Sequence, residues 1–333
     1  MKFLICVFIF IKYLTVSAYP SALYVNKKVD NLILRDDLDK ASLITAIDRQ
    51  LKNFSAHTIP PNYLHLGDTL LTPQIIKDSL QTFKVLLQQN KSIAELSSDI
   101  NKAFTVYTVD TQISQHVTFT GFYHMQLNGS LTKTDEYRYP IYECPQNNFK
   151  KFTRKEIDNN GVLHGLGFEI LWLNDPFERF DLHIQGSGTV VLENGKTIQL
   201  NYACSNDYPF KSVSKKTEEN LFANPRYIFF QKTLDGPLGT NLTHLTAHRS
   251  IATDKTIFPL GGIVFISFNK PMTTSEGKII YERTERFVID QTAGNAIKGP
   301  YRADLYFGED DNAQQQARAL YDRNGQIYYL VKN

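Results

Sequence analysis

Gly294-Asn-Ala-Ile-Lys-Gly-Pro-Tyr-Arg-Ala-Asp-Leu-Tyr-Phe-Gly308 is the stretch that decides the fold and the candidate site. It begins with a glycine-rich bend, passes a Gly-Pro turn and ends in a short strand whose side chains alternate between two faces. One face is apolar, and the other presents a cation, a carboxylate and a phenol: Arg302, Asp304 and Tyr306. The pattern makes Asp304 a candidate acid/base group, and a structural edge strand with a solvated Asp is the alternative.

The segments around this stretch predict a mainly β chain with helices near its N-terminus. Residues 38–104 have apolar residues at helical spacing, with an N-cap at Thr72 and a capping box from Ser92 to Glu95. From residue 115 onward the period changes to two, and Asn324-Gly325 predicts a closing hairpin. Many short strands with Gly and Pro turns favour a barrel over a parallel α/β sheet.

Length and charge limit the function classes. The 333 residues suffice for one large or two moderate domains, and a net charge of +2 gives no electrostatic case for nucleic acid. An aromatic content of 12% fits a groove that binds sugars and fits an ordinary β core equally well.

The N-terminal residues predict export. Lys2 precedes an apolar run over residues 3–16, and small residues up to Ala18 form a cleavage site, so residues 1–18 are predicted to be a signal peptide. Cys6 has no lipobox in front of it, so no lipid anchor is expected. The mature protein should be periplasmic, associated with the outer membrane, or secreted. Its two cysteines, Cys144 and Cys204, could form a disulfide or remain free thiols.

Standard catalytic and metal-binding motifs are not recognised, so no metal and no cofactor are predicted. Three carboxylates in glycine-rich surroundings remain as candidates: Asp254, Asp290 and Asp304. Residues 180–192 are interpreted as a strand pair hinged at Gly186-Ser187-Gly188, where bare backbone beside Gln185 and Ser187 would let a ligand approach closely.

A series of short motifs, in this order, resembles the family of membrane-bound lytic murein transglycosylase A with its C-terminal three-Asp domain. The motifs are Thr120-Gly-Phe-Tyr123, Tyr139-Pro-Ile-Tyr142, Trp172-Leu-Asn-Asp-Pro176, Ile184-Gln-Gly-Ser-Gly188, Asn224-Pro-Arg-Tyr-Ile-Phe-Phe230, residues 249–254, and Ala296-Ile-Lys-Gly-Pro with Arg302-Ala-Asp-Leu-Tyr306.

The resemblance implies a double-psi β-barrel domain with a smaller inserted β domain and a substrate groove between them. The large domain would comprise residues 19–143 and 235–333, and the insert residues 144–234. The implied reaction is cleavage of the β-1,4 bond between N-acetylmuramic acid (MurNAc) and N-acetylglucosamine (GlcNAc) without water, which closes a 1,6-anhydro ring. A monomer that binds peptidoglycan glycan strands is expected.

The family's single acid/base falls on Asp304, with Asp254, Asp290 and Lys298 in support. The expected substrate-binding residues are Thr120, Gly121, Tyr123, Gln185, Ser187, Gly188, Arg302 and Tyr306. Thr292 stands where the family has a supporting Asp, and Asp290, placed on the same strand face, is expected to substitute for it. Cys204 stands where the family has Gly, so a bridge to Cys144 would be particular to this chain.

Two other functions remain open at this point. A barrel like that of expansins could bind glycan without cleaving it, with Asp304 structural. A glycoside hydrolase could instead pair Asp304 with Asp254 as its base.

Overall fold

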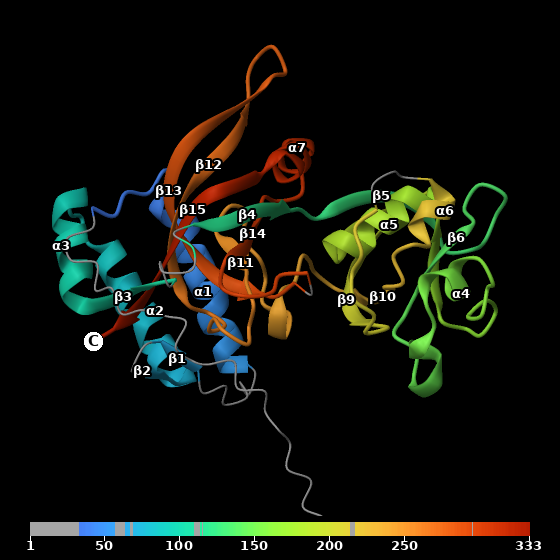
Figure 1. Ribbon diagram of the computed structural model, residues 1–333, viewed down its shortest axis with the longest axis horizontal. Helices are drawn as coiled ribbons and strands as arrows, with labels where there is room; N and C mark the ends of the chain where they lie inside the picture. Colours follow the sequence, from blue (N-terminus) through green and yellow to red (C-terminus); the bar gives the residue numbers. More distant parts are fainter. Residues whose placement is uncertain are drawn as a thin grey trace, which may run out of the picture.

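The computed structural model describes residues 33–56, 64–66, 69–109, 114, 116–213, 217–294 and 296–333. These residues form two large β-sheets, with some helices at one side of the first sheet and others packed with the second sheet (Figure 1). The predicted signal peptide and Cys6 lie outside the described residues. No helix within them is long and apolar enough to span a bilayer.

The first sheet closes into a barrel. Its strand order is β12-β13-β11-β14-β4-β15-β3, and β15 pairs with β12 as well as with β4, so six strands form a ring and β3 is added outside it. The pairs β11–β13 and β14–β4 are parallel. These strands are β3 (Phe104–Thr108), β4 (Val117–Phe122), β11 (Ser250–Ala252), β12 (Ile263–Thr273), β13 (Ile279–Thr292), β14 (Arg302–Tyr306) and β15 (Tyr321–Lys332). The structure thus confirms the predicted mainly β fold with a barrel.

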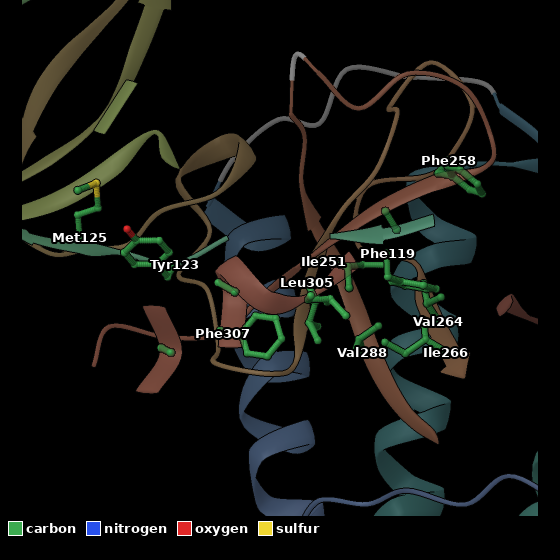
Figure 2. Close-up of a cluster of buried hydrophobic side chains, with 14 of the residues drawn as sticks. Phe119, Tyr123, Met125, Ile251, Phe258, Val264, Ile266, Val288, Leu305 and Phe307 are labelled. Atoms are coloured by element: carbon green, nitrogen blue, oxygen red, sulfur yellow. The ribbon is translucent and has the colours of Figure 1, made fainter. Parts of the chain in front are cut away.

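Apolar side chains from alternate strand positions fill the barrel. Figure 2 shows Phe119, Ile251, Val264, Val288 and Leu305 converging from five strands, and each is fully buried. Because side chains alternate along a strand, the intervening residues of β4, β11 and β14 face outward. This alternation puts Leu305 in the core and leaves its neighbour Asp304 on the other face.

Three helices cover one side of the barrel: α1 (Lys40–Ala56), α2 (Pro73–Gln88) and α3 (Ile93–Ala103). A small hairpin of β1 (Leu64–Leu66) and β2 (Thr69–Leu71) lies between α1 and α2. Both predicted caps are confirmed, since Thr72 accepts a hydrogen bond from the Ile75 amide and Ser92 forms a capping box with Glu95. A seventh helix, α7 (Asp311–Ala319), follows β14 and packs on β4.

The second sheet has the order β10-β9-β8-β5-β7-β6. A bridge from Glu143 to Phe230 brings its two edges together, so this sheet is also barrel-like. The structure joins Cys144 and Cys204 in a disulfide beside that bridge, the first of the two alternatives left open. The strands of this sheet are β5 (Met125–Ser130), β6 (Tyr139–Tyr142), β7 (Glu169–Leu173), β8 (Ser187–Leu192), β9 (Thr197–Ser205) and β10 (Ile228–Thr233). The helices among them are α4 (Arg154–Asp158), α5 (Pro176–Gln185) and α6 (Glu218–Leu221). Two 3-10 turns span Asn147–Lys151 and Thr240–Leu242.

The boundary between the two sheets differs from the predicted one. Strands β5 and β6, which the prediction placed in the large domain, pair within the second sheet. The chain crosses at Tyr123 and His124, where the His124 amide still donates to the carbonyl of Gly308 (2.8 Å). The second sheet therefore begins at Met125 and ends at Thr233.

Two predicted local structures are wrong. Residues 180–185 belong to helix α5, because Asp175 caps the helix, Pro176 opens it and Gly186 ends it with a φ of 81°. The predicted hairpin at Asn324-Gly325 is instead a bulge within continuous strand β15. A Cβ on Gly325 would lie 2.2 Å from the Phe119 ring, so close packing requires the glycine there.

Candidate active site

Strand β14 presents Asp304 on the outward face of the barrel. Asp304 is paired with Thr120 on β4 and with Ala252 on β11, and Ala252 is in turn paired with Thr292 on β13. Paired residues project from the same face of a sheet, so these side chains form one row across four strands. The outward direction of Asp304 is fixed by its two neighbours on the strand, because Ala303 and Leu305 are both fully buried in the barrel.

Two polar side chains contact the Asp304 carboxylate. The Thr120 hydroxyl donates to Oδ1, and the Arg302 Nε lies 3.4 Å from the same oxygen. Asp304 keeps only 17% of its side chain exposed. Burial raises the pKa of Asp304 above its usual value, although the Arg302 charge and the hydrogen bonds from Thr120 and Arg302 oppose the shift. The structure thus brings together three of the predicted site residues.

Asp254 anchors the turn that leads into β14. Its carboxylate accepts hydrogen bonds from the Gly299 amide (2.9 Å) and from the Thr256 amide and hydroxyl (3.0 and 2.7 Å). Burial by itself raises the pKa of Asp254, but these bonds and the charge of exposed Lys298 together hold it below the usual value. This environment stabilises an ionised carboxylate that holds the Lys298-Gly299 turn.

Asp290 is held away from the Asp304 row. A register shift on β13 sets Asp290 beside Ile251 and Thr292 beside Ala252, which are neighbours on β11 and therefore face opposite ways. The expectation that Asp290 shares a face with Thr292 is wrong for this reason. Thr292 itself occupies the row that contains Asp304.

The Asp290 carboxylate belongs to a buried polar cluster. It pairs with Lys255 and accepts hydrogen bonds from Thr253 Oγ1 (2.6 Å) and the Tyr329 hydroxyl (2.7 Å). Burial raises the pKa of Asp290 and lowers the pKa of Lys255, while each charge stabilises the other. Sequence reasoning missed Lys255, although it adjoins Asp254 and is a cation in a mostly buried stretch.

Tyr123 and Gln185 connect the two sheets. The Gln185 side-chain carbonyl accepts from the Tyr123 amide (3.1 Å), at the point where the chain crosses between the sheets. The Tyr123 hydroxyl accepts from Gln314 (2.9 Å) and Arg318 (3.1 Å) of α7, and its side chain is 3% exposed. These contacts join the two sheets and α7, and direct contact of Tyr123 and Gln185 with a ligand stays a prediction.

Ser187 also lies inside the protein. Its hydroxyl is 2.9 Å from Nδ1 of His124, whose Nε2 lies 2.9 Å from the Thr189 hydroxyl. Ser187 is 7% exposed and His124 1% exposed, and burial lowers the pKa of His124 to about 4. The imidazole is therefore neutral near pH 7 and shares its two nitrogens with two hydroxyl groups.

Replacing Ser187 by Ala is expected to lower the free energy of unfolding by roughly 1–3 kcal/mol, because it leaves a buried imidazole nitrogen without its partner. Thermal denaturation measures the change, and Ser98→Ala, at an exposed position of α3, is the matched control. An unchanged melting temperature combined with weaker glycan binding would instead support the predicted substrate-binding role of Ser187.

Gly121, Gly188 and Tyr306 also serve packing. A Cβ on Gly121 would lie 2.6 Å from the Cα of Ala317 in α7, and a Cβ on Gly188 would lie 2.9 Å from Leu182. Tyr306 is 2% exposed and its ring packs against Phe122 with centroids 5.2 Å apart. In the structure these three positions take part in close packing between layers, and their substrate-binding role stays a prediction.

Both the barrel part and the second-sheet part of the chain are similar to known proteins. Residues 118–221 match the family model described as the MltA specific insert domain, and residues 249–331 match the 3D domain. Membrane-bound lytic murein transglycosylase A of Escherichia coli (strain K12) is 25% identical over 245 residues, which cover 65% of this chain and 66% of that protein. The homologue from Buchnera aphidicola is 26% identical over 298 residues, which cover 78% and 79%.

The fold agrees with these matches. The crystal structure of E. coli MltA with bound chitohexaose superposes with a TM-score of 0.71 at 18% identity, covering 92% of this chain and 93% of that one. The two family models together account for the candidate site strands β4 and β14 and for the second sheet up to α6. The chain thus matches the MltA specific insert domain and the 3D domain, and its fold is that of the solved structures of membrane-bound lytic murein transglycosylase A.

Proposed function

We propose that this protein cleaves the β-1,4 bond between MurNAc and GlcNAc in peptidoglycan without water, with Asp304 as its single acid/base. The products would be glycan fragments that end in 1,6-anhydroMurNAc. The observation that carries the proposal is the Asp304 carboxyl, whose pKa is raised by burial while part of the group stays open to solvent.

The first step needs a protonated carboxyl beside the leaving oxygen. A raised pKa increases the protonated fraction of Asp304 at a given pH, and the Thr120 hydroxyl fixes the orientation of the carboxyl group. Asp304 gives its proton to the glycosidic oxygen, and the bond from that oxygen to the muramoyl C1 breaks. The GlcNAc unit leaves with a new hydroxyl at its C4.

The second step needs a base for an internal nucleophile. The ionised Asp304 accepts the proton of the muramoyl C6 hydroxyl, whose oxygen bonds to C1 and closes the anhydro ring, and the carboxyl is regenerated. Because the nucleophile is part of the substrate, a second catalytic carboxylate is not required. The environments of Asp254 and Asp290 support this. The Asp254 carboxylate is hydrogen-bonded to the Gly299 amide, and the Asp290 carboxylate forms an ion pair with Lys255.

The remaining residues of the site would hold this geometry. Arg302 is 38% exposed, donates to the carbonyl of Ala296 (3.2 Å) and lies beside Asp304, so it links the preceding turn to the acid. Asp254 accepts from the Gly299 amide and so fixes the same turn, in which Lys298 lies exposed. The glycan would lie between the two sheets, near the crossing where Arg318 contacts Asp181 (3.2 Å). Peptidoglycan lies outside the cytoplasm, which fits the predicted export.

Purified protein incubated with murein sacculi tests the proposal. We expect soluble muropeptides that carry 1,6-anhydro ends, identified by mass spectrometry, and no incorporation of labelled water. Products with reducing ends and labelled oxygen would identify a hydrolase. Binding to sacculi without any product would identify a glycan-binding barrel.

A further inference from the structure

The row of side chains that contains Asp304 continues one strand further than the residues described above. Thr120 on β4, which contacts Asp304, is itself paired with Tyr321, the first residue of β15. Tyr321 therefore projects from the same outward face as Asp304, two strands away. At the usual strand spacing this separation is roughly 10 Å between backbones.

Tyr321 is an exposed aromatic side chain in a defined position. It is 58% exposed, although the residues on the opposite face of these strands, Phe119 and Asp322, are buried. The Arg323 guanidinium donates to the Tyr321 hydroxyl through Nε (2.9 Å) and Nη2 (2.6 Å) and lies 5.1 Å from the ring centroid. These contacts restrict the ring's orientation and reduce the entropy lost when a ligand binds to it.

A second exposed tyrosine lies at the edge of this surface. Tyr281 is 56% exposed, and its hydroxyl donates to the carbonyl of Ala319 (3.0 Å), two residues before Tyr321. Tyr281 belongs to the β12–β13 hairpin that projects from the barrel in Figure 1. It is paired with Pro271 rather than with a residue of the Asp304 row. Of these two tyrosines, strand register therefore places Tyr321 in the Asp304 row and Tyr281 outside it.

We propose that Tyr321 is a stacking platform for a sugar ring of the glycan strand, at a subsite beyond the bond that Asp304 cleaves. An aromatic face offers apolar contact to the C–H face of a pyranose, and the phenol retains a polar edge that stays wet. Because Tyr321 lies two strands from the acid, its ring meets a sugar neighbouring the cleaved pair. This inference rests on the proposed function and assigns Tyr321 as a positioning residue, with no part in proton transfer.

Binding and kinetics together test the assignment. In the Asp304→Asn background, Tyr321→Ala is expected to weaken binding of chitohexaose by roughly five- to tenfold in isothermal calorimetry, the range of a single aromatic contact. In otherwise unchanged protein it should raise KM on solubilised glycan strands by a similar factor and leave kcat within about twofold, because the residue contributes binding and no chemistry. Tyr321→Trp keeps an aromatic face and should retain binding.

The matched control is Tyr208→Ala, which removes an exposed tyrosine after β9 on the second sheet and should leave both constants unchanged. Melting temperatures of all variants show whether any loss comes from unfolding. If unchanged protein binds and cleaves glycan while Tyr321→Ala does so equally well, the subsite is overturned and the proposed function stands. If the unchanged protein neither binds nor cleaves glycan, both proposals fail. A fall in kcat at constant KM would also overturn the assignment.

Discussion

Replacing Asp304 by Asn is expected to reduce the release of 1,6-anhydro muropeptides by at least about 10³-fold, since one group would lose both its acid and its base role. The amide keeps the shape of the carboxyl group and still accepts the hydrogen bond from Thr120, so the fold should persist. Initial rates on sacculi, followed by chromatography of the muropeptides, measure the effect. Retained turnover would assign the acid to another carboxylate.

The same variant should also change how the stability of the protein depends on pH. Burial raises the folded-state pKa of Asp304 above the unfolded value near 3.8, so protonation favours the folded state. Wild-type stability therefore falls as pH rises from about 3.8 through the folded pKa, and Asn removes that loss. We expect Asp304→Asn to melt at or above the wild-type temperature at pH 7 and to lose this advantage near pH 3. Asp135→Asn, at an exposed loop position, is the control.

Replacing Lys255 by Met is expected to cost roughly 3–5 kcal/mol of unfolding free energy, because it leaves the buried Asp290 carboxylate without its cation. Asp290 has no exposed surface, and Thr253 and Tyr329 supply only neutral donors. The loss should be largest near neutral pH. It should be smaller in acid, where Asp290 takes up a proton because its pKa is raised, and in alkali, where Lys255 of the unchanged protein gives up its proton because its pKa is lowered. Urea unfolding at several pH values measures it.

The double variant Lys255→Met with Asp290→Asn is the control for this prediction. It removes both charges, so most of the lost stability should return. Failure of the second change to recover stability would show that Lys255 contributes through the packing of its aliphatic stem rather than through its charge.

The capped and alternating segments were predictable because their signals are local. Thr72, Ser92 and Glu95 act within one helical turn, and residues 302–305 alternate between faces over a few positions. The interpretation of residues 180–185 as strand failed although Asp175, Pro176 and Gly186 are themselves start and stop signals for a helix. Gly186 and Gly188 suggested a hinge between two strands, whereas Gly186 is the residue that ends the helix.

The ligand-binding predictions illustrate a different limit. Ser187, Tyr123 and Tyr306 carry polar groups that would suit a glycan, yet each is buried by contacts from distant segments. Their hydrogen-bond partners come from residues as far apart as His124 and Arg318. A polar residue type shows which bonds a side chain can form, and only burial shows whether they are already used.

The sequence by itself determined the barrel-rich fold and the helix caps, because hydrophobic alternation, capping and turn chemistry depend on nearby residues. The alternation made Asp304 a candidate acid/base, and the resemblance to the family selected it. Only the tertiary structure decided which side chains share a face with that acid. Strand register places Thr120 beside it and Tyr321 two strands away on the same face, and a bulge turns Asp290 away to Lys255. Pairing between distant strands sets this register, and a shift of one residue reverses the face of every side chain that follows.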